Sequence, residues 1–274
     1  MSDTQRLDAA LVSRGLVSGR EKAKELIAAG QVQVNGVTVT KATRQVGEDD
    51  AVLCDTSSLK YVGRGGFKLE KALELSGLSL AGAVAMDVGA STGGFTDCML
   101  QNGASRVYSV DVGHDQLHYS LREDPRVVCM EGTDVRDADK MCKAVSLASL
   151  DLVTVDVSFI SLNRVIPAIL PYLKPAGTLI CLIKPQFEAG REAVGKNGLV
   201  KDPRVHKRIL TACLREFAEW GIPVKQLTFS PIVGGEGNIE YLAVADRGPQ
   251  TAFSPAEAER IVDTARRELR RDRN

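Results

Sequence analysis

The sequence lacks several features that would assign it to a specialised class. No apolar run approaches the ~18 residues that span a bilayer, and the polar start Met1-Ser2-Asp3 has no signal-peptide core, so we expect a cytoplasmic protein with no membrane partner. The six cysteines form no C-x-x-C pair, which predicts reduced core residues and no metal site. Basic and acidic residues balance at 35 each, so net charge neither supports nor excludes a nucleic-acid partner.

The length of the chain favours two domains. A chain of 274 residues with 44% hydrophobic content can form one large core and one small one. Residues 55–65 are mostly small, polar or glycine, which is typical of a linker. We therefore predict domains over 1–59 and 67–274, joined by a linker over 60–66. The sequence does not indicate the oligomeric state.

The N-terminal segment predicts two short helices packed on a β-hairpin. Apolar residues recur at helical spacing over 6–14, where Gly15 is the stop signal, and again between a Ser18 N-cap and Gly30. Asn35-Gly36 then separates two short apolar runs. This pair favours a type I′ turn because both residues must adopt a positive φ.

The order of these elements, with the stretch from Leu26 to Gly36, resembles the small RNA-binding domain named after ribosomal protein S-four. The resemblance covers nearly all of residues 6–54 and implies an RNA partner, contacted at its phosphates and at the minor groove of A-form helices. The alternative is a solvated helix face, because Glu21 and Glu25 are interleaved with the basic residues. The candidate RNA-binding residues are Arg6, Arg14, Arg20, Lys22, Lys24 and Arg64.

From Phe67 onward, helical and strand-like stretches alternate. This alternation predicts an α/β fold with a mostly parallel sheet and helices on both faces. A final pair of strands, 223–230 and 239–246, is joined by a glycine-rich turn and suits an antiparallel edge, and a last helix is expected over 254–271. The other expected strands lie near residues 83–87, 106–111, 127–131, 150–156 and 178–183.

The most informative motif is the glycine turn from Asp87 to Phe95, after the first of these strands. A strand, a glycine turn and a helix bring backbone N–H groups to the carboxyl edge of a sheet, where α/β folds bind cofactors. The turn lacks the G-x-G-x-x-G spacing of dinucleotide sites, and the acid at its mouth, Asp87, disfavours phosphate. Asp111 closes the next strand, where an acid can accept both hydroxyls of an adenosine ribose. The pattern favours S-adenosylmethionine over a nicotinamide, unless both acids are ordinary strand-end caps.

Two polar residues end apolar strands at the same expected edge of the sheet. Asp156 and Lys184 each follow a strongly apolar run, and Pro185 favours an extended backbone at Lys184. Lys68 and Glu240 complete two lysines and two acids that can converge there. Taken singly, each of these residues is most often part of a surface ion pair.

Five stretches carry a family resemblance: Arg64 to Leu69, Asp87 to Phe95, Asp151 to Leu162, Ile183 to Glu188 and Gly237 to Tyr241. They resemble the hemolysin-A (TlyA) family of ribosomal RNA 2′-O-methyltransferases, whose catalytic domain is similar to FtsJ, and the match runs over essentially the whole chain. The resemblance implies a Rossmann-like methyltransferase that uses S-adenosylmethionine on ribosomal RNA or a ribosomal subunit, with cytidine as the target. Gly63 departs from the family, where a serine is common.

The resemblance also implies the residues of the site. The family's Lys-Asp-Lys-Glu catalytic tetrad corresponds to Lys68, Asp156, Lys184 and Glu240. Asp134 lies where such enzymes contact the adenine amine. The candidate cofactor-binding residues are Asp87, Gly89, Ala90, Ser91, Thr92, Gly93, Gly94, Phe95, Asp111, Asp134 and Asp156.

The chemistry explains why such residues are needed. A ribose 2′-hydroxyl is a weak nucleophile near neutral pH, so it must be oriented toward the methyl group and must lose its proton. Lys184 is the candidate base, which requires a pKa lowered by burial or by a nearby cation such as Lys68. Neighbouring carboxylates oppose this and favour an orienting role. Asp156 would then orient Lys184, Lys68 would hold the ribose oxygen or a phosphate, and Glu240 would position a lysine.

Three other functions are weighed against this one. A ribosome-associated protein with an inactive methylase fold would have lost the tetrad or the glycine turn, and both are present. A membrane-lytic hemolysin needs a spanning or strongly amphipathic segment, which short strands interrupted by acids do not offer. A methylase of exocyclic base nitrogens carries an Asn/Asp-Pro-Pro-aromatic turn after the fourth strand, whereas this sequence has Asp156-Val157-Ser158-Phe159.

Overall fold

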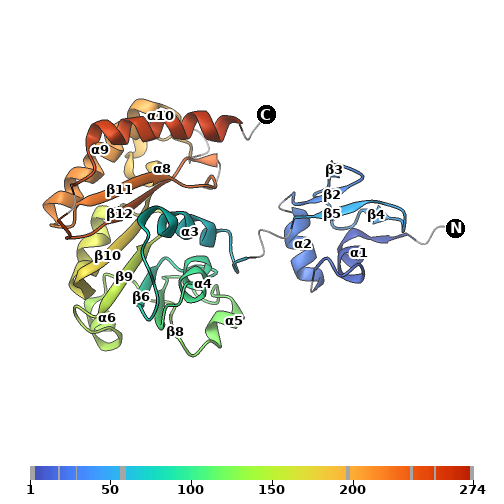
Figure 1. The fold of residues 1–274 in the computed structure, drawn as a ribbon, viewed down its shortest axis with the longest axis horizontal. Coiled ribbons are helices and arrows are strands. Elements are labelled where there is room, and N and C mark those ends of the chain that lie inside the picture. Colours follow the sequence, from blue (N-terminus) through green and yellow to red (C-terminus); the bar gives the residue numbers. More distant parts are fainter. Residues whose placement is uncertain are drawn as a thin grey trace. The chain divides into compact units, whose positions relative to one another are not determined.

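The computed structural model describes residues 4–17, 19–28, 30–55, 60–195, 198–234, 237–249 and 251–271. It divides the chain into two compact units, the first ending at Lys60 and the second beginning at Tyr61. Each unit has its own hydrophobic core. Figure 1 labels the elements of both.

The first unit packs two helices against short strands. Asn35 and Gly36 have φ values of 52° and 78°, which confirms the hairpin predicted between β2 and β3. The strands form one sheet of order β3-β2-β5 and a pair of β1 with β4. The predicted N-cap, Ser18, lies outside the described residues. The elements are β1 (Gln5–Arg6), α1 (Leu7–Ser13), α2 (Arg20–Ala28), β2 (Val32–Val34), β3 (Val37–Thr38), β4 (Gln45–Val46) and β5 (Val52–Cys54).

A buried carboxylate ties this unit together. Asp8 of α1 is fully buried, and it pairs with Arg6 at 3.0 Å and with Arg20 at 2.9 Å. The hydrogen bonds and charges of these two guanidinium groups hold the pKa of Asp8 well below its usual range. Arg14 donates to the carbonyl oxygens of residues 47 and 50, at 2.7 Å each. Three of the residues predicted to bind RNA therefore also stabilise the fold.

The second unit contains a seven-stranded sheet of order β11-β12-β10-β9-β6-β7-β8. The five strands from β8 to β10 pair in parallel, while β12 pairs antiparallel with both β10 and β11. This is the mostly parallel, Rossmann-like methyltransferase sheet that the sequence predicts. The strands are β6 (Val84–Val88), β7 (Arg106–Val110), β8 (Val127–Met130), β9 (Leu150–Val155), β10 (Leu173–Ile183), β11 (Val224–Phe229) and β12 (Tyr241–Ala245).

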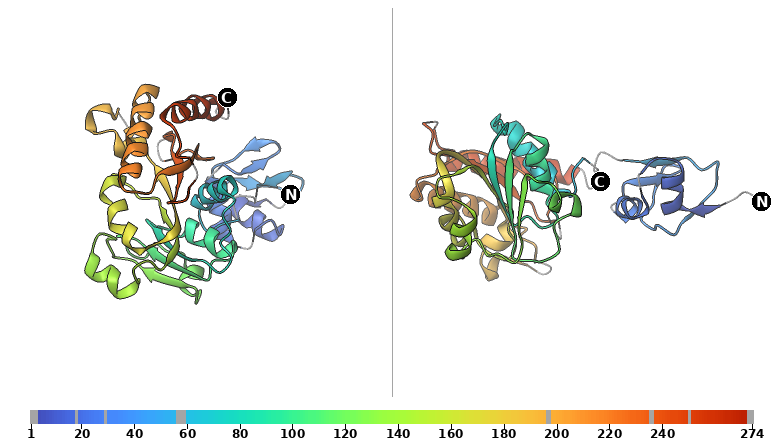
Figure 2. Two further views of the ribbon diagram at one scale, coloured as in Figure 1. Left: turned by 60° about the vertical axis from the view of Figure 1, so that its left-hand side comes forward. Right: turned by 90° about the horizontal axis from the view of Figure 1, so that it is seen from below.

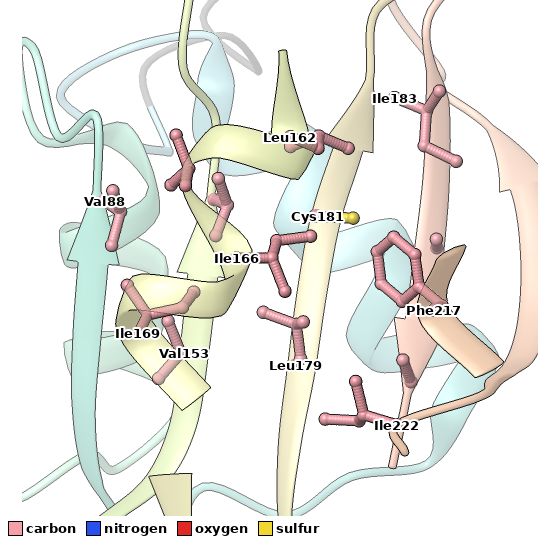
Figure 3. Close-up of a cluster of buried hydrophobic side chains, with 14 of the residues drawn as sticks. Val88, Val153, Leu162, Ile166, Ile169, Leu179, Cys181, Ile183, Phe217 and Ile222 are labelled. Atoms are coloured by element: carbon pink, nitrogen blue, oxygen red, sulfur yellow. The ribbon is translucent and has the colours of Figure 1, made fainter. Parts of the chain in front are cut away.

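Helices cover both faces of this sheet, as Figure 2 shows. The face with α3 and α4 has one apolar cluster, and the face with α6 and α9 has another. In the second cluster, Ile166 and Phe217 lie over Val153 and Leu179 of the central strands (Figure 3). The helices are α3 (Gly65–Ser76), α4 (Gly94–Gln101), α5 (Tyr119–Arg122), α6 (Ala138–Ala144), α7 (Ile166–Ile169), α8 (Pro185–Glu188), α9 (Pro203–Glu219) and α10 (Pro255–Arg271).

The order in which the chain adds strands to the sheet reverses at its centre. From β6 the chain moves outward through β7 to β8, then returns to β9 on the other side of β6. Such a switch point leaves a crevice beyond the carboxyl ends of the two neighbouring strands. The residues that follow β6 and β9 are the glycine turn and Asp156, so the topology places both predicted motifs at this crevice.

The segment predicted as a linker, 60–66, differs in the structure. Tyr61 is only 2% exposed, the backbone N–H of Val62 donates to the carboxylate of Asp97 at 2.8 Å, and α3 already begins at Gly65. A Cβ on Gly66 would lie 2.3 Å from the ring of Tyr61. The glycines that suggested a linker instead permit close packing.

Three smaller predictions also need correction. β10 begins at Leu173 and not near residue 178, and Glu240 lies just before β12 and not within it. Cys98, Cys181 and Cys213 are buried as predicted, but two other cysteines, Cys129 and Cys142, are exposed. Neither exposed cysteine belongs to a group that could hold a metal ion among the described residues.

Replacing Asp8 tests the ion pairs of the first unit. We expect Asp8→Asn to destabilise this unit by about 1–3 kcal/mol, because two guanidinium groups lose a buried acceptor. Hydrogen exchange of the intact chain should then report faster exchange in α1 and α2, with β6 and β9 unchanged. The exposed Asp49→Asn is the matched control. Unaltered protection in α1 would contradict the assignment.

Candidate active site

The glycine turn after β6 passes close beneath the neighbouring strand end. Gly89 has a φ of 84°, and a Cβ there would lie 2.6 Å from the backbone oxygen of Asp156. Gly93 has a φ of 94°, and a Cβ there would collide with Leu121 at 2.3 Å. Both positions therefore require glycine. Gly93 serves packing, whereas the other turn residues face a cavity.

Two adjoining cavities extend along the carboxyl ends of the strands, within the second unit. The first has a volume of 530 Å³ and the second 550 Å³. The first is lined by the predicted residues Arg64, Lys68, Asp87, Gly89, Ala90, Ser91, Thr92, Gly94, Phe95, Asp156, Lys184 and Glu240. The second is lined by Asp111, Val112, Gln116, Asp134 and Arg136, and both share Gly89, Ser91, Asp156, Ser158 and Phe159. An elongated ligand can therefore occupy both cavities at once.

Asp87 does not present its charge at the mouth of the turn, as the sequence suggested. Its side chain is fully buried and accepts hydrogen bonds from the backbone N–H and hydroxyl of Thr96 and from the hydroxyl of Thr154. Burial raises the pKa of Asp87 to about 7, against these hydrogen bonds, and the charge of Asp156 adds to the rise. Asp87 thus fixes the first turn of α4 through its hydrogen bonds with Thr96.

Two more of the predicted cofactor acids, Asp111 and Asp134, line the second cavity. Asp111 accepts from the backbone N–H of Ser91 at 2.8 Å and of Gly113 at 2.7 Å, so it joins the glycine turn to the loop after β7. Asp134 pairs with Arg136 at 2.6 Å, and this contact lowers the pKa of Asp134. Both acids are therefore held in place in the second cavity, whereas the two lysines line the first.

The predicted tetrad comes together in the first cavity. Nζ of Lys68 lies 2.7 Å from Oε2 of Glu240 and 3.4 Å from Oδ2 of Asp156. Nζ of Lys184 lies 2.6 Å from Oδ1 of Asp156, and it donates to the hydroxyl of Ser158 at 3.1 Å. The exposed fractions of the two lysine side chains are 11% and 8%. Asp156 is thus shared between two nearly buried ammonium groups.

The backbone explains how each of these side chains is aimed. Lys184 directly follows β10 and is extended, with φ −106° and ψ 103°, as the following proline predicts. Lys68 lies in the first turn of α3. Glu240 packs against Gly234, where a Cβ would lie 2.1 Å from the carboxylate. The tetrad therefore draws on three strand ends or loops and one helix.

The two lysines of the tetrad are matched by two carboxylates, Asp156 and Glu240. Burial lowers the pKa of Lys68, but the charges of Asp156 and Glu240 and their hydrogen bonds outweigh it, so its pKa is raised overall. Lys68 is therefore a cation at neutral pH. Lys184 donates one hydrogen bond, to Ser158, and its contact with Asp156 is an ion pair. Because an ammonium group has three N–H donors, Lys184 can also donate to a substrate oxygen.

Two residues of the site had no role in the sequence analysis. Phe159 is 91% exposed, has a φ of 63° and lines both cavities. Its ring lies 5.1 Å from that of Phe187. Ser158 holds Lys184. The sequence signal was the turn Asp156 to Phe159, where an aromatic residue closely follows a strand-ending acid.

The strand order, the glycine turn and the paired cavities define a Rossmann-like methyltransferase. Comparison with known proteins assigns the family. Residues 61–247 match the model of the FtsJ-like methyltransferases, and residues 5–52 match the S4 domain. The chain therefore belongs to the FtsJ-like methyltransferase family and carries an S4 domain.

Individual relatives are similar over most of their length. YqxC of Bacillus subtilis, named as a candidate rRNA methyltransferase, is 47% identical over 88% of this chain and 85% of its own. The 16S/23S rRNA (cytidine-2′-O)-methyltransferase TlyA of Mycobacterium tuberculosis is 41% identical over 88% of this chain and 89% of its own. The solved structure of a candidate hemolysin from Streptococcus thermophilus is 39% identical, with a TM-score of 0.77 over 100% of this chain and 99% of that one.

S-adenosylmethionine is the cofactor of this family, and the residues present suit it. The turn residues line the first cavity and Asp111 lines the second, where its carboxylate could accept hydrogen bonds from a ribose diol. In the described part of the chain, no helix is long and apolar enough to cross a membrane.

The buried carboxyl of Asp87 predicts a pH dependence of stability. Its pKa is raised to about 7, above the ordinary value near 4, so the folded protein binds this proton more tightly than the unfolded chain does. The free energy of unfolding should therefore fall as pH rises from about 4 to about 7, with a slope of up to about 1.4 kcal/mol per pH unit from this group, and level off above that. Urea unfolding of the wild type and Asp87→Asn across this range should show a flatter dependence for the variant. Parallel curves would disprove the titration.

Proposed function

We propose that this protein methylates the 2′-hydroxyl of a ribose in ribosomal RNA, with cytidine as the target nucleotide. The observation that carries the proposal is the convergence of Lys68, Asp156, Lys184 and Glu240 within 3.4 Å contacts beside the cofactor turn. The names of the relatives support the RNA substrate, and the S4 domain supports RNA binding. Ribosomes are made in the cytoplasm, so we place the reaction there.

The reaction needs an oriented oxygen and an exit for one proton. S-adenosylmethionine, when bound, supplies an electrophilic methyl carbon on a sulfonium. The oxygen–carbon bond forms as the carbon–sulfur bond breaks, with its electron pair remaining on sulfur, and the hydroxyl proton is released. Lys184 directs an N–H toward the 2′-oxygen. Because Asp156 lies 2.6 Å from its ammonium, we favour an orienting role for Lys184, in which the proton leaves to water.

The other charged residues hold the RNA and each other. Lys68 contacts the ribose or an adjoining phosphate, and Glu240 fixes Lys68 through their 2.7 Å ion pair. Arg64, exposed at the start of α3, offers a second cation for a phosphate. Phe159 supplies an exposed ring on which the target base can stack.

In the first unit, phosphate contacts are proposed for the same basic residues that the sequence suggested. Arg6 and Arg20 keep side-chain exposures of 42% and 55% despite their pairing with Asp8. Their outer N–H groups can therefore still reach a phosphate. Lys22 and Lys24 lie on the adjacent helix α2.

The substrate is tested by mass spectrometry of ribosomal RNA nucleosides. A strain that lacks this protein should lose 2′-O-methylcytidine at the site or sites it modifies, and a plasmid copy should restore it. The Lys184→Ala copy should not restore it. Unchanged 2′-O-methylcytidine in the deletion strain would refute the substrate assignment.

The tetrad is tested with paired lysine variants. We expect Lys184→Ala to lower kcat at least 1,000-fold while RNA affinity changes less than threefold, because the group that orients the oxygen is lost. Lys174→Ala is the matched control, since Lys174 lies at the other end of β10 in a 2.6 Å pair with Asp151. A pH–rate profile separates the two roles of Lys184. A base must first lose its proton, so kcat would rise with pH, whereas the orienting role predicts no such rise.

The stacking role of Phe159 is tested separately. Phe159→Ala should raise the KM for RNA about tenfold, since stacking on an aromatic ring contributes roughly 1–3 kcal/mol per base. Phe159→Trp should retain most of the affinity. Equal KM values for all three proteins would remove Phe159 from substrate binding.

A further inference from the structure

The loop after β7 is fastened by one carboxylate that does not itself line either cavity. Glu131 follows β8, and its side chain is 11% exposed. Its Oε1 accepts from the backbone N–H groups of Gln116 and Leu117, at 2.8 Å each, and its Oε2 accepts from that of Asp115 at 3.0 Å. Three consecutive amides therefore converge on a single side chain.

An arginine completes this arrangement from the other side. A guanidinium nitrogen of Arg122 contacts Oε2 of Glu131, and its Nε donates to the carbonyl oxygen of Leu117 at 2.9 Å. Glu131 thus binds three N–H groups of the loop, and Arg122 binds one of the loop's carbonyl groups. Asp115, which the loop holds at a φ of 56°, is 99% exposed and contributes only this backbone contact and a weak 3.8 Å pair with Arg122.

The fastened loop is the outer wall of the second cavity. Val112 and Gln116 line that cavity beside Asp111. Val112 is 69% exposed, so the loop presents an apolar side chain and an amide to whatever occupies the space. Nothing else in the described part of the chain binds the backbone amides of residues 115–117. Without Glu131 these three amides would lose their acceptor, whereas the carbonyls of Asp111 and Gly113 would stay bonded to the backbone N–H groups of Thr133 and Gly132.

We infer that Glu131 and Arg122 are positioning residues that set the affinity for the methyl donor, by holding Gln116 against its nucleoside end. This assignment concerns donor binding alone, and it holds whichever RNA nucleotide accepts the methyl group. An amide in place of the carboxylate has one acceptor oxygen and turns an NH2 group toward the remaining donors. Glu131→Gln should therefore loosen the loop without removing any group that touches the donor.

The test uses calorimetric titration with S-adenosylhomocysteine, which shares the nucleoside end and does not react. Glu131→Gln should raise its Kd at least tenfold, and it should raise the KM for S-adenosylmethionine by the same factor while kcat at saturating donor stays within twofold. A merely structural defect would lower kcat as well. Asp124→Asn is the matched control, because Asp124 pairs with Arg126 at 2.7 Å away from the loop.

A second variant keeps the test decisive if Glu131→Gln does not fold. Arg122→Gln should also raise the Kd for S-adenosylhomocysteine. The double variant should bind no more weakly than the weaker-binding single variant, since both residues act through one loop. Hydrogen bonds from the loop and from Arg122 outweigh burial and lower the pKa of Glu131 to about 2, so the effect should be constant from pH 6 to 9. Wild-type Kd in a folded Glu131→Gln or Arg122→Gln would overturn the inference.

Discussion

The site depends on one carboxylate that serves two ammonium groups. Asp156 lies 2.6 Å from Lys184 and 3.4 Å from Lys68, in a cavity where all three side chains are mostly buried. Removing the shared anion would leave two lysines facing each other with little solvent between them. The position of Asp156 is itself fixed by the sheet, because its backbone N–H donates to Val88 of β6 at 2.9 Å and its carbonyl lies against Gly89.

The fold and the chemistry are therefore coupled at the switch point of the sheet. The strand order leaves a crevice between the ends of β6 and β9. Glycine is required at position 89, where the segments after these two strands come closest. The acids that hold the walls are themselves anchored by backbone amides, as with Asp111 and Glu131. The second cavity and the first, which contains the two lysines, therefore share part of their lining.

Much of this arrangement could be predicted from the sequence. Apolar runs that end in Asp156 and Lys184 give the strand ends, and a parallel sheet brings such ends to one edge. The roles of single charges were harder to predict, because they depend on burial. Asp87 reads as an exposed acid but lies beneath α4, and Arg6 reads as an RNA contact but also neutralises Asp8. The glycines of residues 63–66 read as a linker because the sequence does not show that Tyr61 and Phe95 pack against them. Phe159 was missed since exposure cannot be predicted from residue type.

The position of the donor's sulfur atom decides most directly whether the four charged residues can act on the methyl group. A crystal structure of the intact chain with S-adenosylhomocysteine should place the nucleoside between Val112 and Asp134. The sulfur should lie in the first cavity, beside the side chains of Lys184 and Asp156, and the ion pairs of Lys68 should be intact. A ligand bound with its sulfur turned away from the tetrad, or a Lys184 that leaves Asp156 when the site is filled, would contradict the proposed roles of these residues.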